Sequence, residues 1–382
     1  MAMNKHAPGE HIRRVVVKVG SNVLTCDQGL NLPVIDALSR QISRLIVDRR
    51  DVILVSSGAL AAGVRKLAIK SRPEAIPARQ AVAAVGQAGL ILTWEKAFAR
   101  HGKKVAQILL TAEDMTSRKR YLNARNTLNT LLTWGVIPII NENDTVMVDE
   151  IKFGDNDNLA AVIALLMDAD ILINLTDIDG LYDKNPRIHG DAELIPTIET
   201  IGKEIERYAG DIPGALGTGG MLSKIKAARK VTAAGIPMII ANGKANQVLE
   251  GIFGGQSPGS FFKPKTERLS SRKCWLAFSL KPKGVIQIDA GAARAITTGG
   301  KSLLPSGITD VSGQFNVGDP VRFSGKDGQV LGNGLVNYSA GDIRKIKGLR
   351  TSEITGCLGE KPYDEVIHRD NLVLTSNMLN GC

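Results

Sequence analysis

Short runs of apolar, mostly β-branched residues recur along the first 241 residues of the chain. Runs of this length and composition are typical of strands that are buried on both faces of a sheet. They occupy residues 13–19, 52–56, 104–110, 136–140, 171–175 and 236–241. We therefore predict that these segments are strands of one sheet.

Longer segments with helical spacing separate the strands. Three of them, residues 34–50, 78–102 and 121–135, are long enough for crossover helices. Strands that alternate with helices and connect by right-handed crossovers form a mostly parallel sheet. The predicted fold class is therefore α/β, a mostly parallel sheet sandwiched by helices, which binds ligands beyond the carboxyl ends of its strands.

The pattern changes near residue 255. Residues 254–265 are rich in Gly, Pro and Ser, and short strand and turn signals follow them. A chain of 382 residues also exceeds the usual size of a single hydrophobic core. We predict an α/β domain over residues 1–265, a linker over 266–282, and a small β-rich domain with a C-terminal tail over 283–382.

Composition argues against several classes of protein. Hydrophobic residues make up 43 % and charged residues 23 % of the chain, as in ordinary globular proteins. The longest apolar run is about half of what a bilayer requires, and the first residues resemble no signal peptide, so we expect a soluble, cytoplasmic protein. The 4 cysteines lack metal-binding spacing, which argues against a disulfide framework and a zinc site.

Two lysines stand where a sheet of this kind presents its ligands. Lys18 lies at the end of the first predicted strand, before a Gly-Ser turn, and this combination suits a phosphate. Lys224 lies in the first turn of a predicted helix, where an ammonium group opposes the helix dipole and so suggests a nearby anion. The alternative for each is an ordinary solvated lysine. The glycine-rich stretches 217–224 and 297–302 do not match a Walker loop.

Small residues with free N–H groups follow the second strand, over residues 56–63. This placement again suits a ligand at the sheet edge, because the first N–H groups of a helix have no partner within the helix. Ser57 therefore either contacts a ligand or caps the helix that begins here.

Residues 140–161 contain six carboxylates and four asparagines, although the chain carries a formal net charge of +10. An EF-hand is excluded, because its oxygen spacing and the glycine at its sixth position are missing. Asp157 or Asn158 instead faces a ligand or caps the next helix. Asp177 and Asp179 follow another strand, so lysines and carboxylates meet at one sheet edge. This composition suits a charged substrate and a magnesium-bound nucleotide.

A series of motifs resembles, in order and over almost the whole chain, the glutamate 5-kinase family of the amino acid kinase superfamily. The motifs are KVGSNVLT, VSSGALAAG, AAVGQAGL, LLTAEDM, YLNARNTL, PIINENDTV, IKFGDNDNLAA, NLTDIDGLYDKNPR, GTGGMLSKIKAA, LLPSGI and VIHRDNL. Residues 283–358 resemble a PUA domain. One departure is Asn185, where many members of the family carry Asp.

The resemblance implies Mg²⁺-dependent transfer of the ATP γ-phosphoryl group to the side-chain carboxylate of L-glutamate, the first step of proline biosynthesis. Lys18 and Lys224 would contact the transferring group, and Asp157 would orient both lysines. The implied glutamate-binding residues are Ser57, Asp144 and Asn156. The implied nucleotide-binding residues are Lys18, Thr176, Asp177, Thr218, Gly219, Gly220, Met221, Leu222, Ser223 and Lys224. No protein ligand of the metal is assigned.

The resemblance also implies a homo-oligomer, a dimer or a tetramer, with feedback inhibition by proline. Its labile product would pass to glutamyl phosphate reductase. One alternative within the enzyme class is a related kinase that acts on aspartate, N-acetylglutamate or carbamate.

A second alternative is an RNA-binding protein, because PUA domains elsewhere bind RNA and the pI is about 9.4. Residues 343–350 form a local basic patch. Residues 283–382, however, contain eleven Lys and Arg against ten Asp and Glu, so they lack the charge excess that dominates nucleic-acid affinity. We therefore do not expect RNA as a partner.

Overall fold

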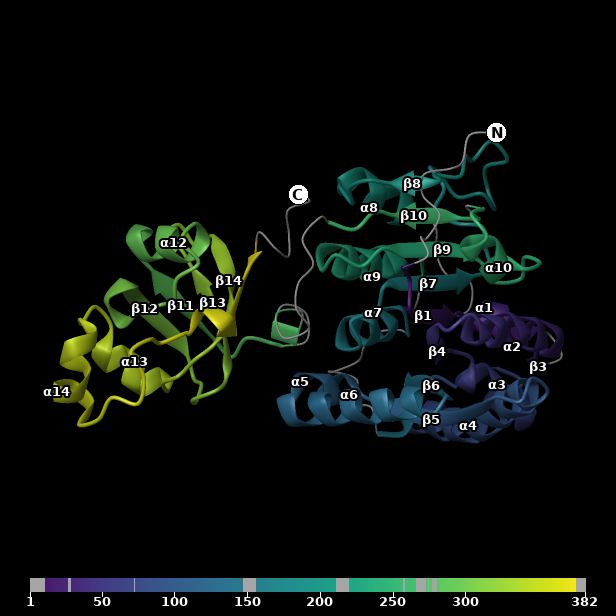
Figure 1. The fold of residues 1–382 in the computed structure, drawn as a ribbon, viewed down its shortest axis with the longest axis horizontal. Helices are drawn as coiled ribbons and strands as arrows, with labels where there is room; N and C mark the ends of the chain where they lie inside the picture. Colours follow the sequence, from purple (N-terminus) through teal and green to yellow (C-terminus); the bar gives the residue numbers. More distant parts are fainter. Residues whose placement is uncertain are drawn as a thin grey trace. The chain divides into compact units, whose positions relative to one another are not determined.

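The computed structural model shows two compact units, Met1–Arg268 and Leu269–Asn380 (Figure 1). It describes residues 11–26, 29–71, 73–146, 156–210, 220–256, 258–265, 273, 275–276 and 280–375. Most of the predicted linker lies outside the described residues, and the predicted domain boundaries stay a prediction.

The first unit is built on an eight-stranded sheet with the order β5-β6-β4-β1-β7-β9-β10-β8. Its strands are β1 (Arg14–Val19), β4 (Asp51–Ser56), β5 (Lys104–Leu110), β6 (Val136–Glu142), β7 (Ile171–Thr176), β8 (Thr197–Ile198), β9 (Met238–Asn242) and β10 (Ser260–Phe262). Neighbouring strands are parallel except for the antiparallel pair β9 and β10. The six predicted strands and the mostly parallel sheet are confirmed. The short strands β8 and β10 were not predicted, because two or three residues are too few to show a pattern.

Helices cover both faces of this sheet (Figure 1). They are α1 (Ser21–Leu24), α2 (Leu32–Val47), α3 (Ala59–Lys66), α4 (Ile76–Ala99), α5 (Ala112–Thr116), α6 (Arg118–Thr133), α7 (Asn156–Leu166), α8 (Lys203–Gly210), α9 (Met221–Ala233) and α10 (Val248–Phe253), with the 3₁₀ turn η1 (Asp144–Val146). A small hairpin, β2 (Thr25–Cys26) and β3 (Gly29–Leu30), follows α1. The three predicted crossover helices correspond to α2, α4 and α6.

Alternation along the central strands decides which side chains face which helical layer. Val15, Val17 and Val19 of β1 belong to one apolar core with residues of α2 and α4. Because successive side chains of a strand point to opposite faces, Lys18 faces the other layer, where α7 packs against β1 and α9 packs against α7. The same alternation places Ile173 and Leu175 of β7 in the first core.

The strand order reverses at β1, the point where an open α/β sheet binds its ligands. The chain passes from β1 to β4 on one side, and β7 pairs with β1 on the other. Val19 is level with Ser56 on β4 and with Leu175 on β7. The segments after these three strands therefore begin at one edge of the sheet.

The second unit contains a five-stranded mixed sheet with the order β12-β11-β13-β14-β15. Its elements are β11 (Gly284–Ile288), α12 (Ala290–Thr297), η3 (Pro305–Gly307), β12 (Ile308–Gly313), β13 (Pro320–Ser324), β14 (Val330–Leu335), α13 (Ala340–Ile346), η4 (Thr351–Glu353), α14 (Ile354–Leu358), η5 (Arg369–Asn371) and β15 (Leu372–Leu374). Ile286, Phe323 and Ile343 lie in its own buried core. The predicted β-rich character of this region is confirmed. Across the described parts of both units, no helix is long and apolar enough to cross a membrane.

Two glycines let α3 and α4 approach each other at backbone distance. A Cβ atom on Gly86 would lie 1.8 Å from the carbonyl oxygen of Ala59, and one on Gly63 would lie 1.9 Å from that of Val82. Real Cβ atoms do not approach backbone atoms so closely. This contact fixes the start of α3, and with it the turn that contains Ser57.

We predict that Gly86→Ala lowers the free energy of unfolding by about 2 kcal/mol or more, because overpacking forces the two helices apart. Gly89 lies three residues further along α4 and has open space where a Cβ would stand. Gly89→Ala is therefore the matched control, and it should stabilise the protein by up to about 1 kcal/mol through helix propensity. Urea unfolding of both variants measures the difference; equal effects would contradict the role of the helix contact.

Candidate active site

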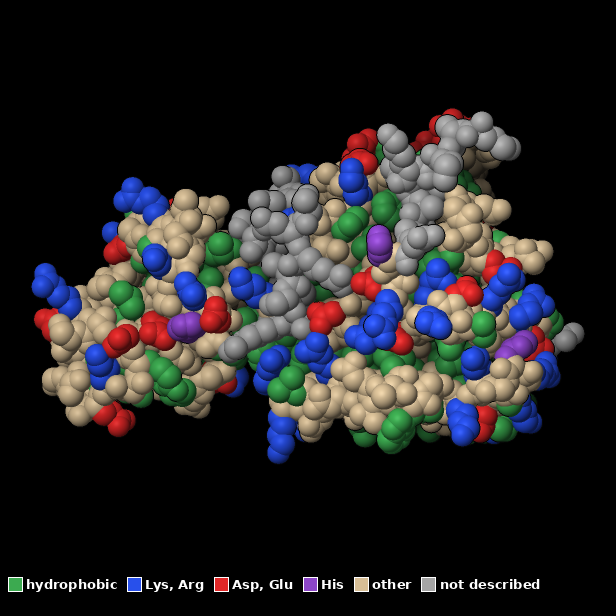
Figure 2. Space-filling model, viewed as in Figure 1, with side chains coloured by type: hydrophobic (Ala, Val, Ile, Leu, Met, Phe, Trp, Pro, Cys, Tyr) green, Lys and Arg blue, Asp and Glu red, His purple; other side chains and the backbone are tan. Residues whose placement is uncertain are grey.

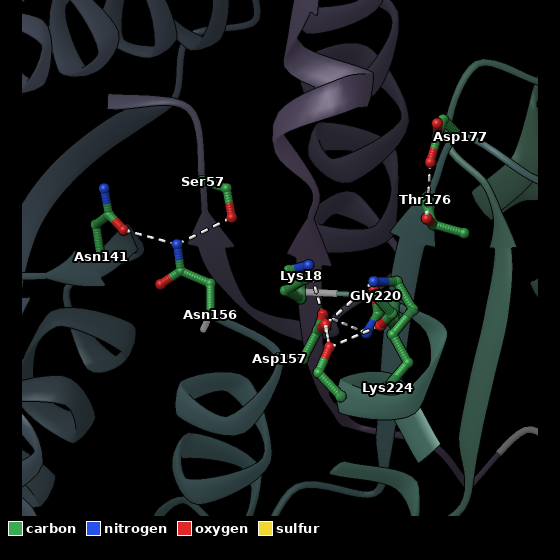
Figure 3. Close-up of polar contacts among 11 residues, drawn as sticks. Lys18, Ser57, Asn141, Asn156, Asp157, Thr176, Asp177, Gly220 and Lys224 are labelled. Atoms are coloured by element: carbon green, nitrogen blue, oxygen red, sulfur yellow. Dashed lines mark hydrogen bonds and ion pairs between the residues drawn. The ribbon is translucent and has the colours of Figure 1, made fainter. Parts of the chain in front are cut away.

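The carboxylate of Asp157 is the centre of a buried polar cluster between the sheet and two helices (Figure 3). Asp157 is the second residue of α7, and its exposed fraction is 0 %. Its Oδ1 lies 2.5 Å from Nζ of Lys18 and accepts a hydrogen bond of 2.8 Å from Nδ2 of Asn174. Its Oδ2 lies 3.1 Å from Nζ of Lys224 and 2.6 Å from Oγ of Ser223. Each carboxylate oxygen thus has one ammonium group and one neutral donor.

Both lysines of this cluster are buried. The side chains of Lys18 and Lys224 are 6 % and 7 % exposed. Lys18 comes from β1 and Lys224 from the first turns of α9, so the structure brings together two lysines that are more than 200 residues apart in sequence. The alternative of solvated lysines is wrong for both. Buried charges need partners, and one carboxylate between two ammonium groups leaves a net charge of +1.

Asp157 remains ionised in this environment. Burial alone would raise the pKa of its carboxyl group, but the ammonium groups of Lys18 and Lys224 outweigh burial. Hydrogen bonds from Lys18 and Ser223 add to their effect, and together these groups hold the pKa of Asp157 well below its ordinary value of 3.8. Asp157 is therefore a fixed negative charge and has no role as a proton acceptor near neutral pH.

Contacts between α7 and α9 hold the two ends of this cluster in place. One step along α7, Asn158 accepts a hydrogen bond from Lys230 of α9. At the start of α9, Gly220 is the N-cap residue, and no side chain caps the helix there. The first N–H groups of α9 therefore face the site without a side-chain cap, as in helix ends that bind anions.

A second polar group lies at the end of β4 and β6 (Figure 3). Asn156 donates from Nδ2 to Oγ of Ser57 and to Oδ1 of Asn141, both at 2.9 Å. Its own Oδ1 is buried and accepts no hydrogen bond from the described residues. Ser57 does not cap α3, because the N-cap residue is Gly58, which adopts a left-handed φ of 102°. Capping, the alternative for Ser57, is therefore wrong.

The remaining predicted substrate residue, Asp144, begins η1 immediately after β6 and is partly exposed. The rest of the acid-rich stretch, residues 147–155, lies outside the described residues, as do Thr218 and Gly219. Asp157 does not cap α7, because its carboxylate bonds to Asn174 and Lys224 instead.

Thr176 and Asp177 form a separate group at the end of β7 (Figure 3). The Asp177 carboxylate accepts hydrogen bonds from Asn22 at 3.1 Å, from Arg187 at 2.7 Å and from Thr176 at 3.2 Å. Desolvation works to raise the pKa of Asp177, but the hydrogen bond from Asn22, with smaller contributions that include the charge of Arg187, lowers it overall. The carboxylates that follow the strands at this edge therefore belong to separate groups, one around Asp157 and one around Asp177.

Two further residues of the edge have structural partners. Asp179 accepts from Tyr182 and from Asn242. Asn185 accepts a 3.0 Å hydrogen bond from the backbone of Arg187 through its Oδ1. An asparagine oxygen and an aspartate oxygen serve equally as this acceptor, so the departure at Asn185 keeps the turn.

Sequence reasoning missed two residues of the buried clusters. Asn141 was part of a polar stretch in which nothing marked it out, and Asn174 lay inside a predicted strand. The available signal for Asn174 is that it interrupts an otherwise apolar run, Ile171–Leu175.

Comparisons with known proteins show the family to which the chain belongs. The model of the amino acid kinase family matches residues 13–242, and the model of the PUA domain matches residues 284–358. The chain is 53 % identical over 374 residues to glutamate 5-kinase of Syntrophus aciditrophicus, covering 98 % of this chain and 97 % of the relative. It is 51 % identical to that of Meiothermus ruber (96 % and 97 % covered) and 50 % identical to that of Geobacter sulfurreducens (95 % and 98 % covered).

We predict that Asp157→Asn lowers the free energy of unfolding at pH 7 by about 3 kcal/mol or more, because it leaves two buried ammonium groups without their counter-charge. Asp179→Asn, at an exposed position of the same sheet edge, should change it by less than about 0.5 kcal/mol. Denaturant unfolding of both variants provides the comparison.

The difference between wild type and Asp157→Asn should depend on pH. Because the folded state lowers the pKa of Asp157, its stabilisation is complete above the ordinary value of 3.8 and is lost as the pH falls below that value. The gap in unfolding free energy should therefore be constant from pH 8 to about pH 5 and narrow in stronger acid. A gap that changes between pH 8 and 5 would show that Asp157 titrates there, contrary to this expectation.

Proposed function

The chain belongs to the amino acid kinase family and, within it, to the glutamate 5-kinases, and we propose that the cluster around Asp157 is its phosphoryl-transfer site. The chain phosphorylates the side-chain carboxylate of L-glutamate with ATP to form L-glutamyl 5-phosphate, the first step of proline biosynthesis. The resemblance seen in the motifs is confirmed, as is the PUA domain. One observation carries the proposed location: two buried lysines share a single ionised carboxylate at the ligand-binding edge of the sheet.

The chemical difficulty of this reaction is electrostatic. The glutamate side chain has a pKa of about 4.3 and is already ionised at neutral pH, so it needs no general base. It is an anion that must approach an anionic phosphoryl group. The loose transition state places further charge on the equatorial oxygens and on the leaving ADP.

The positive charges of Lys18 and Lys224 offset this repulsion between anions. Their ammonium groups enter the site from β1 and from α9 and carry the net positive charge of the cluster. Asp157 orients both, and because it stays ionised it does not remove a proton from either the lysines or the substrate. In a water-poor site, groups held in place in this way stabilise developing charge without reorganising.

The group around Asn156 suits the bound glutamate. Substrate glutamate carries an ammonium group as well as two carboxylates. The buried Oδ1 of Asn156 accepts no hydrogen bond from the described residues and is a suitable acceptor for an N–H donor. Ser57 and Asp144 supply further polar groups from the ends of β4 and β6. These three residues would position the substrate beside the lysines.

The nucleotide is assigned to the other side of the cluster. Thr176 and Asp177 end β7, and residues Gly220–Lys224 open α9, whose uncapped N–H groups suit phosphate oxygens. Thr218 and Gly219 would complete this segment.

The residues present also fit Mg²⁺ held by the nucleotide. Both oxygens of Asp157 are occupied by protein donors, and no group of three His, Cys, Asp or Glu side chains in the described residues suits a metal ion. Mg²⁺ commonly keeps several waters and binds through substrate phosphates, so the phosphates would supply its main ligands. When bound, Mg²⁺ neutralises part of the phosphate charge.

Several partners follow from the family resemblance. We propose a cytoplasmic homo-oligomer, a dimer or tetramer, that is inhibited by proline and passes its acyl phosphate to glutamyl phosphate reductase. RNA is not proposed: on the face shown in Figure 2, Lys and Arg of the second unit are interspersed with Asp and Glu. Its ion pairs Lys283–Asp319 and Lys347–Asp310 also occupy part of its positive charge.

Trapping the acyl phosphate as a hydroxamate tests the reaction. ATP and Mg²⁺ are supplied with L-glutamate, L-aspartate, N-acetyl-L-glutamate or carbamate in parallel. Of the four acceptors, only L-glutamate should give product, and no product should form when ATP is omitted. Preference for another acceptor would keep the role of the lysines but overturn the assignment of the Asn156 group.

We predict that Lys18→Ala and Lys224→Ala each lower turnover by about a hundredfold or more, because each removes a preorganised charge that acts in the transition state. The KM for glutamate should change only a few-fold. Lys226→Ala is the control, since Lys226 lies on α9 but is exposed. Normal turnover in either active-site variant would contradict its role.

We predict that Asp144→Ala chiefly raises the KM for glutamate, by about tenfold, because the substrate ammonium group loses a charged partner. Thr145→Ala, at the exposed neighbouring position, should leave KM unchanged. Steady-state kinetics with saturating ATP separates the two parameters. A collapse of turnover at constant KM would assign Asp144 to phosphoryl transfer.

A further inference from the structure

Asn174 is a buried amide in the middle of an apolar strand. Every residue of β7 is buried, and Asn174 has an exposed fraction of 0 %. It pairs in register with Lys18 on the neighbouring strand β1. Its neighbours Ile173 and Leu175 point into the apolar core on the opposite face, so Asn174 shares the face of the sheet from which Lys18 reaches Asp157.

The amide of Asn174 is only half satisfied. Its Nδ2 donates to Oδ1 of Asp157 at 2.8 Å, whereas its own Oδ1 is buried and accepts no hydrogen bond from the described residues. A buried acceptor without a partner destabilises a fold, and a leucine of similar size would avoid this penalty. Among the described residues, the contact with Asp157 is the hydrogen bond of this side chain that offsets the penalty.

The donors around Asp157 form two matched pairs. Oδ1 has Lys18 and Asn174, and Oδ2 has Lys224 and Ser223. During phosphoryl transfer the ammonium groups must also attract the phosphoryl oxygens, so they cannot anchor the carboxylate alone. The neutral donor Ser223 has a second acceptor, the carbonyl oxygen of Gly220 at 2.8 Å, and it belongs to the segment assigned to the nucleotide. Asn174 is the neutral donor that stands on a central strand of the sheet.

We propose that Asn174 is a positioning residue for phosphoryl transfer, which holds Oδ1 of Asp157 so that the carboxylate keeps Lys18 directed at the reacting group. This inference rests on the proposed role of Asp157 and the two lysines. Asn174 itself contacts neither substrate. Its effect on the reaction passes through the orientation of the carboxylate.

Asn174→Leu tests the proposal, because leucine fills a similar volume without a donor. In this variant Oδ1 of Asp157 keeps Lys18 but loses the donor Asn174, so the carboxylate shifts whenever the ammonium group shifts. Small misplacements of catalytic groups lower reaction rates strongly. We expect kcat to fall about tenfold while the KM values for ATP and glutamate change less than about twofold.

Gln41→Leu is the matched control. Gln41 is also a buried amide, 2 % exposed, and it accepts a 2.9 Å hydrogen bond from the backbone of Leu249, but it lies on α2 in the opposite helical layer. Its replacement should lower the melting temperature and leave kcat per folded molecule unchanged. Thermal unfolding and the active fraction are measured for both variants.

The outcomes separate the inference from the proposed function. An unchanged kcat in Asn174→Leu, with a lowered melting temperature as in Gln41→Leu, would overturn the positioning role. If Asn174→Leu does not fold, Asn174→Thr suits a strand and ends one bond short of the amide nitrogen, so the same loss of kcat is expected. Lys18→Ala is assayed in parallel. Retained turnover in Lys18→Ala would overturn the proposed function of the cluster. Lost turnover in Lys18→Ala together with normal turnover in Asn174→Leu would overturn only the positioning role of Asn174.

Discussion

The bridge from one ionised carboxylate to two buried ammonium groups is the interaction on which the active site depends. Lys18, Asp157 and Lys224 lie on three different elements, so the bridge forms only if β1, α7 and α9 converge within hydrogen-bonding distance. Without Asp157 the two ammonium groups would be buried and uncompensated. The folding of this unit and the assembly of its site are therefore the same event.

The topology of the sheet makes this convergence possible. Reversal of strand order at β1 places the carboxyl ends of β1, β4 and β7 side by side, with helical layers on both faces. One layer is apolar and packs α2 and α4 against the sheet, and the other carries the charged cluster. The polar groups for glutamate come from the ends of β4 and β6, so the two substrates would approach the lysines from different strands.

Much of the fold was predictable because strands that are buried in a parallel sheet consist of continuous apolar runs in the sequence. The six long strands appeared in this way, whereas β8 and β10 are too short to show any period. The site was less accessible. Reasoning from the residues alone left Lys18 and Lys224 as either ligands or solvated side chains, since burial of a lysine depends on a partner distant in the chain. Asp157 was assigned through the family resemblance, and Asn174 was invisible because its partner is known only from the fold. Asp177 was expected at this sheet edge, but its donors Asn22 and Arg187 could not be identified, because proximity to one sheet edge does not determine which donor a carboxylate selects.

The central claim is that the two lysines bind the phosphoryl group more tightly in the transition state than in the ground state. Calorimetry of wild type and Lys224→Met with Mg-ADP, aluminium fluoride and L-glutamate, which mimic the transferring group, tests it most directly. The variant should bind this mimic about a hundredfold more weakly, yet bind a non-hydrolysable ATP analogue within about fivefold of wild type. Equal weakening of both complexes would show that the lysines contribute only ground-state binding and would contradict the mechanism.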